Sequence, residues 1–328
     1  MMTFSPCCIR VAMLNADTSV PNVYANLGTF GDILHRKLLA AADRACDGLS
    51  ITHSVYNVVI GEYPDSLDGW DAIFITASAA ASYDDEAWIK KLEEYVVMVY
   101  TRHRNIRLFG SCFGHHIICQ ALLKDHGVHV ARRPGGWEIG VSQVEFTDEF
   151  KEAFTHARSA SVKDSGLQLP GRLPTPESDG ADGDDKASLS LERADRVVPD
   201  KAYLEFVHAD EVFLPLPEVS LPEPWILLGY TEHCKVPGIY QPGRVLTLQG
   251  HFEFDTFKSQ DTLRIFGACE ASNPQLYNDP GVGETCGPEY VDDGEAVVDI
   301  LVRFLAGERA VTRLRRDKFM AHVDLPTP

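Results

Sequence analysis

Short apolar runs alternate with longer segments of helical periodicity in the first third of the chain. Runs that begin at Ile9 and Ile51, and a third around Ile73, have the length and composition of buried strands. Residues 31–45, GDILHRKLLAAADRA, instead repeat apolar residues every three or four positions, as an amphipathic helix does. The pattern therefore predicts a strand, a helix and two further strands in this order.

The next segment repeats the alternation. Residues 83–100 carry an apolar stripe at helical spacing, and a short strand from Ile106 to Phe109 leads through a glycine-flanked turn into a further helix. The strand around Ile73 is apolar on both faces, which suits a parallel sheet with helices on either side. This alternation predicts an α/β fold with a doubly wound sheet.

The second half of the chain has a different pattern. GWEIGVSQVEFT, from Gly136, predicts an edge region of antiparallel strands, and strand-like order returns in AYLEFVHADEVF, in WILLGYTEH and in GRVLTLQGHFEF, whose strand we expect to reach His251. Residues 159–200 are rich in Pro, Gly, Ser and Asp, which indicates a mobile acidic insertion. Residues 258–328 are expected to form a C-terminal extension that contains a closing helix, so that residues 1–328 make one domain.

Composition narrows the possible partners. The 328-residue chain has 48 acidic and 30 basic side chains, a formal charge of −18 that repels nucleic acid and anionic membrane surfaces. No apolar run approaches the roughly 20 residues of a membrane span, and the first residues do not resemble a secretory signal. We expect a cytoplasmic protein without nucleic-acid or membrane partners, in which the eight dilute cysteines are thiols.

One cysteine stands in an unusual setting. In GSCFGHHIICQ, residues 110–120, Cys112 lies between two glycines and is followed by His115, His116 and Cys119. Cys112 could be a metal ligand together with one of these histidines and Cys119, a nucleophile, or a small core residue. No paired-cysteine motif supplies the remaining zinc ligands, so no metal and no cofactor is expected.

The surroundings of Cys112 favour the nucleophile. A buried strand ahead and a helix behind, with glycines two positions away on each side, are typical of a nucleophile elbow. The amino end of the following helix favours thiolate over thiol. Far downstream, QGHFEF offers His251 as a base, and Glu253 would orient it because residues two apart on an extended strand point the same way.

These motifs together resemble those of class I glutamine amidotransferases. GSCFGHH resembles the GxCxGxQ elbow of that family, and QGHFEF resembles its closing HPE motif. The ITAS turn after the third strand, GWEIG and PGRVLTLQGH extend the likeness from about Ile9 to Phe257, apart from the insertion. The resemblance implies a three-layer α/β/α flavodoxin-like fold whose sheet is mostly parallel with an antiparallel edge.

The resemblance also implies roles for individual residues. Cys112 would attack a γ-glutamyl amide carbonyl, His251 would act as general base and acid, and Glu253 would orient His251. The oxyanion would be held by the backbone N–H of Phe113 and by one from the turn that contains Ala77 and Ser78. Ammonia or an amine would leave, and water would release glutamate.

Two positions depart from the family motif. The glutamine of the elbow is His116 here, which changes the hydrogen bonds available beside the nucleophile. The glycine of the oxyanion turn is Ala77, which resists positive φ and would give the turn a different shape.

Substrate-binding residues follow from the same resemblance. His208 and Asp210 resemble an HxD segment near the family's glutamine pocket, although a solvated strand end would give the same pattern. His116 beside the nucleophile and Trp137 at the rim of the site complete the expected set.

Three functions remain open at the level of sequence. The chain has no GxxxxGK loop and no segment long enough to be a synthetase. It could be a stand-alone hydrolase or transferase of γ-glutamyl bonds in glutamine, γ-glutamyl peptides or glutathione conjugates, a layout that resembles plant γ-glutamyl peptidases. It could be a glutaminase subunit that supplies ammonia to a separate synthetase. It could also be a catalytically silent binding protein.

Overall fold

The structure is a computed structural model of the chain. It describes residues 7–17, 21–45, 49–155, 198–215, 221–253 and 293–321. The predicted insertion at 159–200 lies outside the described residues except for its last three positions, and residues 258–292 of the predicted extension lie outside them entirely.

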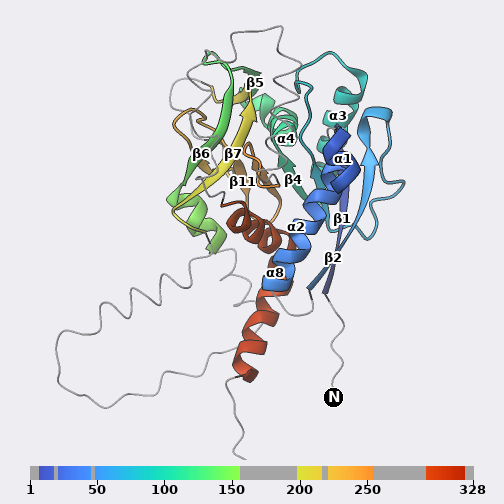
Figure 1. Cartoon of the computed structure of the whole chain (residues 1–328), viewed down its shortest axis with the longest axis vertical. Coiled ribbons are helices and arrows are strands. Elements are labelled where there is room, and N and C mark those ends of the chain that lie inside the picture. The colour runs from blue at the N-terminus through green and yellow to red at the C-terminus, as the bar shows by residue number, and fades with distance from the viewer. Residues whose placement is uncertain are drawn as a thin grey trace, which may run out of the picture.

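A seven-stranded sheet, in the order β2-β1-β3-β4-β12-β11-β9, forms the centre of the molecule (Figure 1). Its strands are β1 (Cys7–Asn15), β2 (Leu49–Asn57), β3 (Ala72–Ile75), β4 (Arg107–Ser111), β9 (Ile226–Leu227), β11 (Ile239–Gln241) and β12 (Val245–Leu248). The strands from β2 to β12 in this order are parallel, whereas β11 and β9 are antiparallel to their neighbours. The predicted fold class, with its antiparallel edge, is confirmed.

Helices cover both faces of this sheet. They are α1 (Pro21–Leu27), α2 (Phe30–Ala45), α3 (Ala87–Arg102), α4 (Phe113–Leu123), α8 (Gly294–Ala321) and a helix over residues 148–155, with 3₁₀ turns at Val58–Ile60 and Lys124–His126. In β1, Val11 and Met13 belong to the core shared with α2 and α8, and Ala12 and Leu14 belong to the core shared with α3 and α4. Because successive strand residues face opposite ways, the two apolar cores account for strands that are apolar on both faces.

The edge of the main sheet is formed by β11 and β9, whereas the antiparallel strands that begin at Gly136 do not join it. β6 (Glu138–Phe146), β7 (Lys201–His208) and β10 (Gly229–Tyr230) make a three-stranded sheet of their own, and β5 (His129–Arg132) pairs with β8 (Asp210–Phe213). The burial of β6 explains the difference, because mainly alternate positions are buried. A strand with one buried face suits a sheet that covers a core on one side.

The predicted strand that reaches His251 is wrong in its extent. β12 ends at Leu248, and His251 makes only an isolated antiparallel bridge with Glu205 of β7. A Cβ atom added at Gly250 would lie 3.1–3.2 Å from the side chains of Leu204 and Phe206. The chain therefore leaves the main sheet after β12 and passes closely against β7.

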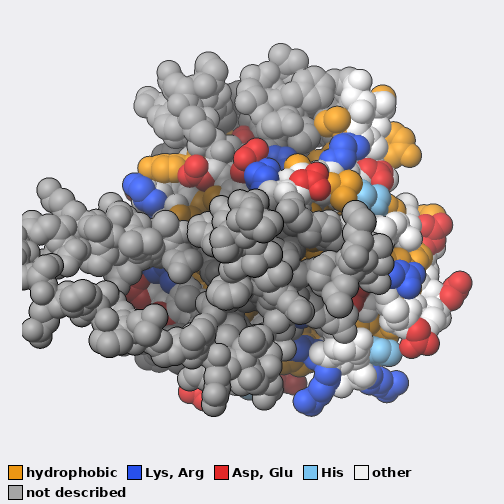
Figure 2. Space-filling view, turned by 90° about the horizontal axis from the view of Figure 1, so that it is seen from below, with side chains coloured by type: hydrophobic (Ala, Val, Ile, Leu, Met, Phe, Trp, Pro, Cys, Tyr) orange, Lys and Arg blue, Asp and Glu red, His pale blue; other side chains and the backbone are white. Residues whose placement is uncertain are grey.

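The predicted closing helix is present and continues beyond its predicted range as α8. Its backbone is interrupted at Gly307, which has φ 52° and ψ −149°. Within the described part of the chain, none of the helices combines the length and the apolar character that crossing a membrane requires. Figure 2 shows the molecule from below; where described side chains are visible, acidic, basic and apolar ones are interspersed.

Candidate active site

Cys112 occupies a strained turn between β4 and α4. Its φ of 49° and ψ of −107° make it the one non-glycine residue with positive φ among the residues described. A Cβ atom at Gly110 would lie 2.3 Å from the carbonyl oxygen of Gly114, and one at Gly114 would lie 2.2 Å from that of Ile75. Both glycines are therefore required by close backbone approaches, as the elbow pattern predicts.

Substituting Gly110 by alanine is expected to lower the free energy of unfolding by about 3 kcal/mol, because the added methyl meets backbone that cannot move aside. Gly243→Ala is the matched control. Gly243 has φ 67° and nothing within 4 Å of an added Cβ, so only the backbone strain of about 1 kcal/mol applies. Urea unfolding measures both variants, and equal losses would contradict the close contact at Gly110.

His251 and Glu253 lie together beside Cys112. Nδ1 of His251 is 2.8 Å from Oε1 of Glu253, and both side chains are buried. Burial by itself lowers the pKa of His251, but the charges of Glu253 and Cys112 and hydrogen bonds to both raise it to about 10. Burial raises the pKa of Glu253, but the charge and hydrogen bond of His251 lower it on balance. The contacts thus favour a protonated His251 ring that lies between the Glu253 carboxylate and Cys112.

Gln249 makes a second polar contact with the nucleophile. Its Nε2 donates to Sγ of Cys112 over 3.6 Å, and its Oε1 lies 2.5 Å from Nε2 of His116. The pKa of His116 falls to about 3, first because of burial and then because of the nearby charge of His208. We did not predict Gln249 from the sequence. The signal that could have found it is an amide residue directly after the apolar strand VLTL and two positions before His251.

His115 and Cys119 form hydrogen bonds to each other, to Thr247 and to Val236. Nδ1 of His115 is 2.8 Å from Oγ1 of Thr247, and its Nε2 is 3.0 Å from the carbonyl oxygen of Val236. Sγ of Cys119 lies 3.5 Å from Nδ1 of His115, and burial raises the pKa of Cys119. Over the described ranges, no group of three or more His, Cys, Asp or Glu side chains could hold a metal ion. These two residues instead connect α4 to β12.

His208 is part of a buried ion pair between β6 and β7. Its Nε2 lies 2.9 Å from Oε2 of Glu138, and its Nδ1 lies 2.7 Å from the carbonyl oxygen of Asp210. Burial raises the pKa of Glu138, but the hydrogen bond and the charge of His208 lower it on balance. These two contacts fix the orientation of the His208 ring between β6 and β7. A substrate contact through either ring nitrogen, as expected from the sequence, would require one of these hydrogen bonds to break.

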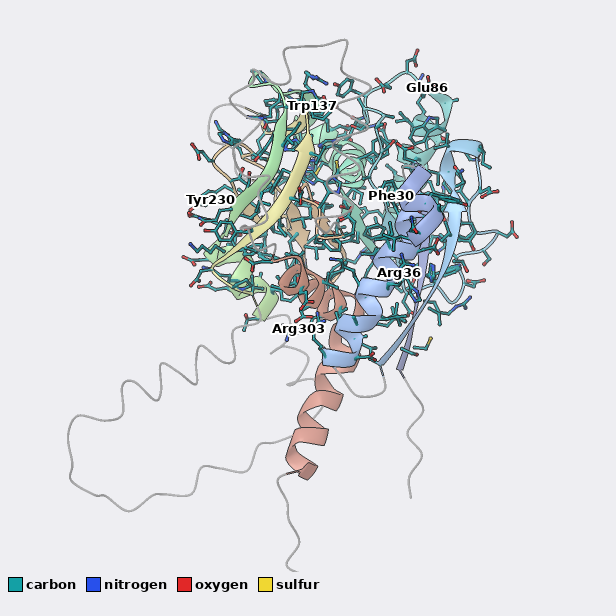
Figure 3. All side chains as sticks on the ribbon, viewed as in Figure 1. Phe30, Arg36, Glu86, Trp137, Tyr230 and Arg303 are labelled. Atoms are coloured by element: carbon teal, nitrogen blue, oxygen red, sulfur yellow. The ribbon has the colours of Figure 1, made fainter. Side chains whose placement is uncertain are left out.

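Asp210 and Trp137 lie nearer the surface. Oδ1 of Asp210 accepts a hydrogen bond of 2.8 Å from the hydroxyl of Tyr83, which lies in the loop between β3 and α3. The guanidinium of Arg132 stacks 5.4 Å from the ring centroid of Trp137. Figure 3 shows Trp137 and Glu86 at the end of the molecule toward which the parallel strands run. That end also carries the elbow, because Cys112 follows the last residue of β4. The substrate contacts of Asp210 and Trp137 stay predictions.

The turn predicted to complete the oxyanion site follows β3. Oγ1 of Thr76 accepts from the backbone N–H of Ala16 over 3.0 Å and donates to the carbonyl oxygen of Ala77. Ala77 has negative φ, so an alanine is tolerated where the family has glycine. Phe113, directly after the nucleophile, is the first residue of α4, so its backbone N–H lies at the amino end of the helix. The roles of Phe113, Ala77 and Ser78 stay predictions.

Comparisons with known proteins place this geometry in context. No family model matches the chain. A Schizosaccharomyces pombe protein named as glutamine amidotransferase-like is 26% identical over 270 residues, which are 81% of this chain and 88% of that protein. Gamma-glutamyl peptidase 3 of Arabidopsis thaliana is 26% identical over 203 residues, covering 61% of this chain and 62% of the peptidase.

The same likeness is found among solved structures. A glutamine amidotransferase of Thermotoga maritima superposes with a TM-score of 0.52 at 18% identity, covering 92% of this chain and 98% of its own. The chain resembles glutamine amidotransferases in sequence and in fold. The resemblance predicted from the elbow and the closing motif is therefore confirmed, whereas the solved structure by itself supports only the fold.

The likeness to glutamine amidotransferases draws attention to the one position of the elbow motif where the residue type differs. The position that holds glutamine in the family motif is His116 here, and His116 is buried against Gln249. Its predicted contact with substrate stays a prediction. What the geometry adds is a partner for His116 inside the protein, in direct contact with the nucleophile.

Proposed function

We propose that the chain is a thiol-dependent hydrolase or transferase of γ-glutamyl amide bonds, with Cys112, His251 and Glu253 as its catalytic triad. One observation carries the proposal. Cys112 stands on a strained elbow and shares a hydrogen bond with His251, whose pKa is raised by the charges of Glu253 and Cys112 despite its burial. Structural ion pairs also perturb pKa values, but they do not require a strained cysteine at the start of a helix.

The reaction would proceed in two balanced steps. The thiolate of Cys112 attacks the γ-carbonyl carbon, and the resulting oxyanion is held by backbone N–H groups of Phe113 and of the turn at Ala77 and Ser78. The imidazolium of His251 gives its proton to the departing nitrogen, which leaves as ammonia or an amine, and a γ-glutamyl thioester remains. Neutral His251 then takes a proton from water, hydroxide attacks the thioester, and glutamate and the thiolate are released.

The substrate is held, in this proposal, at the rim of the site. The carboxylate of Asp210 is partly exposed and is the acidic group that we assign to the α-ammonium of the γ-glutamyl moiety. Tyr83 fixes this carboxylate through its hydroxyl, and Trp137 borders the opening. The γ-glutamyl peptidase among the relatives supports a peptide or glutathione conjugate as the substrate.

The glutamine amidotransferase-like relative favours a second candidate, a glutaminase subunit whose partner is a separate synthetase. Glutamate release from glutathione, from a glutathione S-conjugate and from glutamine separates the two. We expect kcat/KM for the γ-glutamyl peptides to exceed that for glutamine by tenfold or more, about 1.4 kcal/mol of transition-state binding. Glutamine use that rises only when a synthetase is added would favour the second candidate. Absence of glutamate from every substrate would support a silent binding protein.

A further inference from the structure

Gln249 contacts the nucleophile but takes part in neither step of the proposed reaction. We propose that Gln249 is a positioning residue that His116 holds in one orientation, so that its amide N–H stabilises and directs the thiolate of Cys112. The inference rests on the proposed function, because it assumes that Cys112 reacts as a thiolate. It assigns the substituted residue of the elbow to the nucleophile instead of to the substrate.

The geometry fixes both ends of the Gln249 side chain. Its Oε1 is 2.5 Å from Nε2 of His116, and its Nε2 is 3.6 Å from Sγ of Cys112. Gln249 is fully buried and His116 nearly so, which leaves water little access to either contact. With a thiolate at Cys112, the reversed amide would direct a carbonyl oxygen at a negative sulfur. The thiolate therefore selects the orientation in which Nε2 faces it, and Nε2–H of His116 completes the arrangement.

His208 influences the protonation of His116, which orients Gln249. Burial and the positive charge of His208 both oppose protonation of His116, so its ring is neutral and donates from one nitrogen only. An imidazolium at this position would compete with His251 for the negative charge of the thiolate. The neutral ring orients Gln249 without adding such a charge. The imidazolium beside the nucleophile is then the one that can pass its proton to the leaving group.

The effect on the thiolate can be measured without a substrate. Iodoacetamide alkylates Cys112 as the thiolate, and the rate against pH, followed by intact mass, gives the midpoint of thiolate formation. Gln249→Leu removes the N–H donor, so the midpoint should rise by about one pH unit, a roughly tenfold slower alkylation below it. Gln241→Leu is the matched control, because Gln241 is a buried glutamine whose amide donates to Tyr100 at 2.9 Å. It should change stability without moving the midpoint.

Two variants of His116 test the orientation separately. His116→Phe keeps a ring but removes the donor to Gln249, so the midpoint should rise, while His116→Gln restores a side-chain N–H and should recover at least half of that rise. These variants also decide the matter if Gln249→Leu does not fold. Unshifted midpoints in folded variants at both positions would overturn the inference while leaving the proposed function intact. Failure of Cys112 to react in the unsubstituted protein would overturn both.

Discussion

Replacing Cys112 by alanine is expected to lower the rate of glutamate release by about 10⁴-fold or more, since a nucleophile that forms a covalent intermediate cannot be replaced by a bound water without loss on this scale. The same change should abolish covalent labelling by a diazo-ketone analogue of glutamine. Intact mass before and after treatment measures the adduct, and steady-state release of glutamate measures the activity. The size of the effect follows from the place of Cys112, the strained residue in contact with His251.

Cys119 supplies the control for this experiment. It lies on α4, the helix that follows Cys112. It is fully buried, and burial raises the pKa of its thiol, so it should take no label. Cys119→Ala should retain both the adduct and the release of glutamate, with a loss of stability of about 1 kcal/mol or more from the cavity. An adduct of equal yield in the Cys112→Ala protein would show that another thiol reacts, and it would contradict the proposed triad.

The sequence predicts the central fold well because the relevant signals are local. Apolar runs such as the one around Ile73 reflect burial on both faces of a parallel sheet, and β3 is buried at every position. The elbow could also be predicted, because Gly110 and Gly114 satisfy contacts with backbone that is close in the chain or in the neighbouring strand. In each case the residue type at the position indicates the constraint, even where the contact comes from another segment, as Ile75 does for Gly114.

Other features depend on contacts between distant segments, and the sequence predicts them poorly. The separate sheet of β6 and β7 forms because one face of these strands is covered by other segments. Alternation of apolar residues along one strand predicts that a face is buried, but it does not predict which strand pairs with it. The end of β12 at Leu248 depends on the approach of Gly250 to β7. An extended strand was therefore the wrong reason for expecting His251 and Glu253 to meet. They meet at 2.8 Å in a bend, beyond the end of the strand.

The second large effect is expected at Glu253. Glu253→Gln retains the size of the side chain and removes the charge that raises the pKa of His251, so burial should then favour neutral imidazole. We expect kcat/KM to fall by about 10³-fold or more, because the thiolate loses its imidazolium and the leaving group its proton donor. The midpoint of thiolate formation at Cys112, measured by the rate of iodoacetamide alkylation against pH, should rise. A variant with an unchanged pH profile would show that Glu253 does not control His251.

The raised pKa of His251 predicts how the free energy of unfolding depends on pH. The pKa is about 10 in the folded chain against an ordinary 6.5, so the folded state retains a proton that the unfolded state releases between these values. The stabilisation is therefore complete below pH 6.5 and is lost as the pH rises through about 10. Urea unfolding at pH 6.5 and at pH 9.5 should show this loss, and Glu253→Gln should make it smaller. Gln241→Leu, which removes a buried amide that does not titrate, should lower stability without changing this dependence on pH.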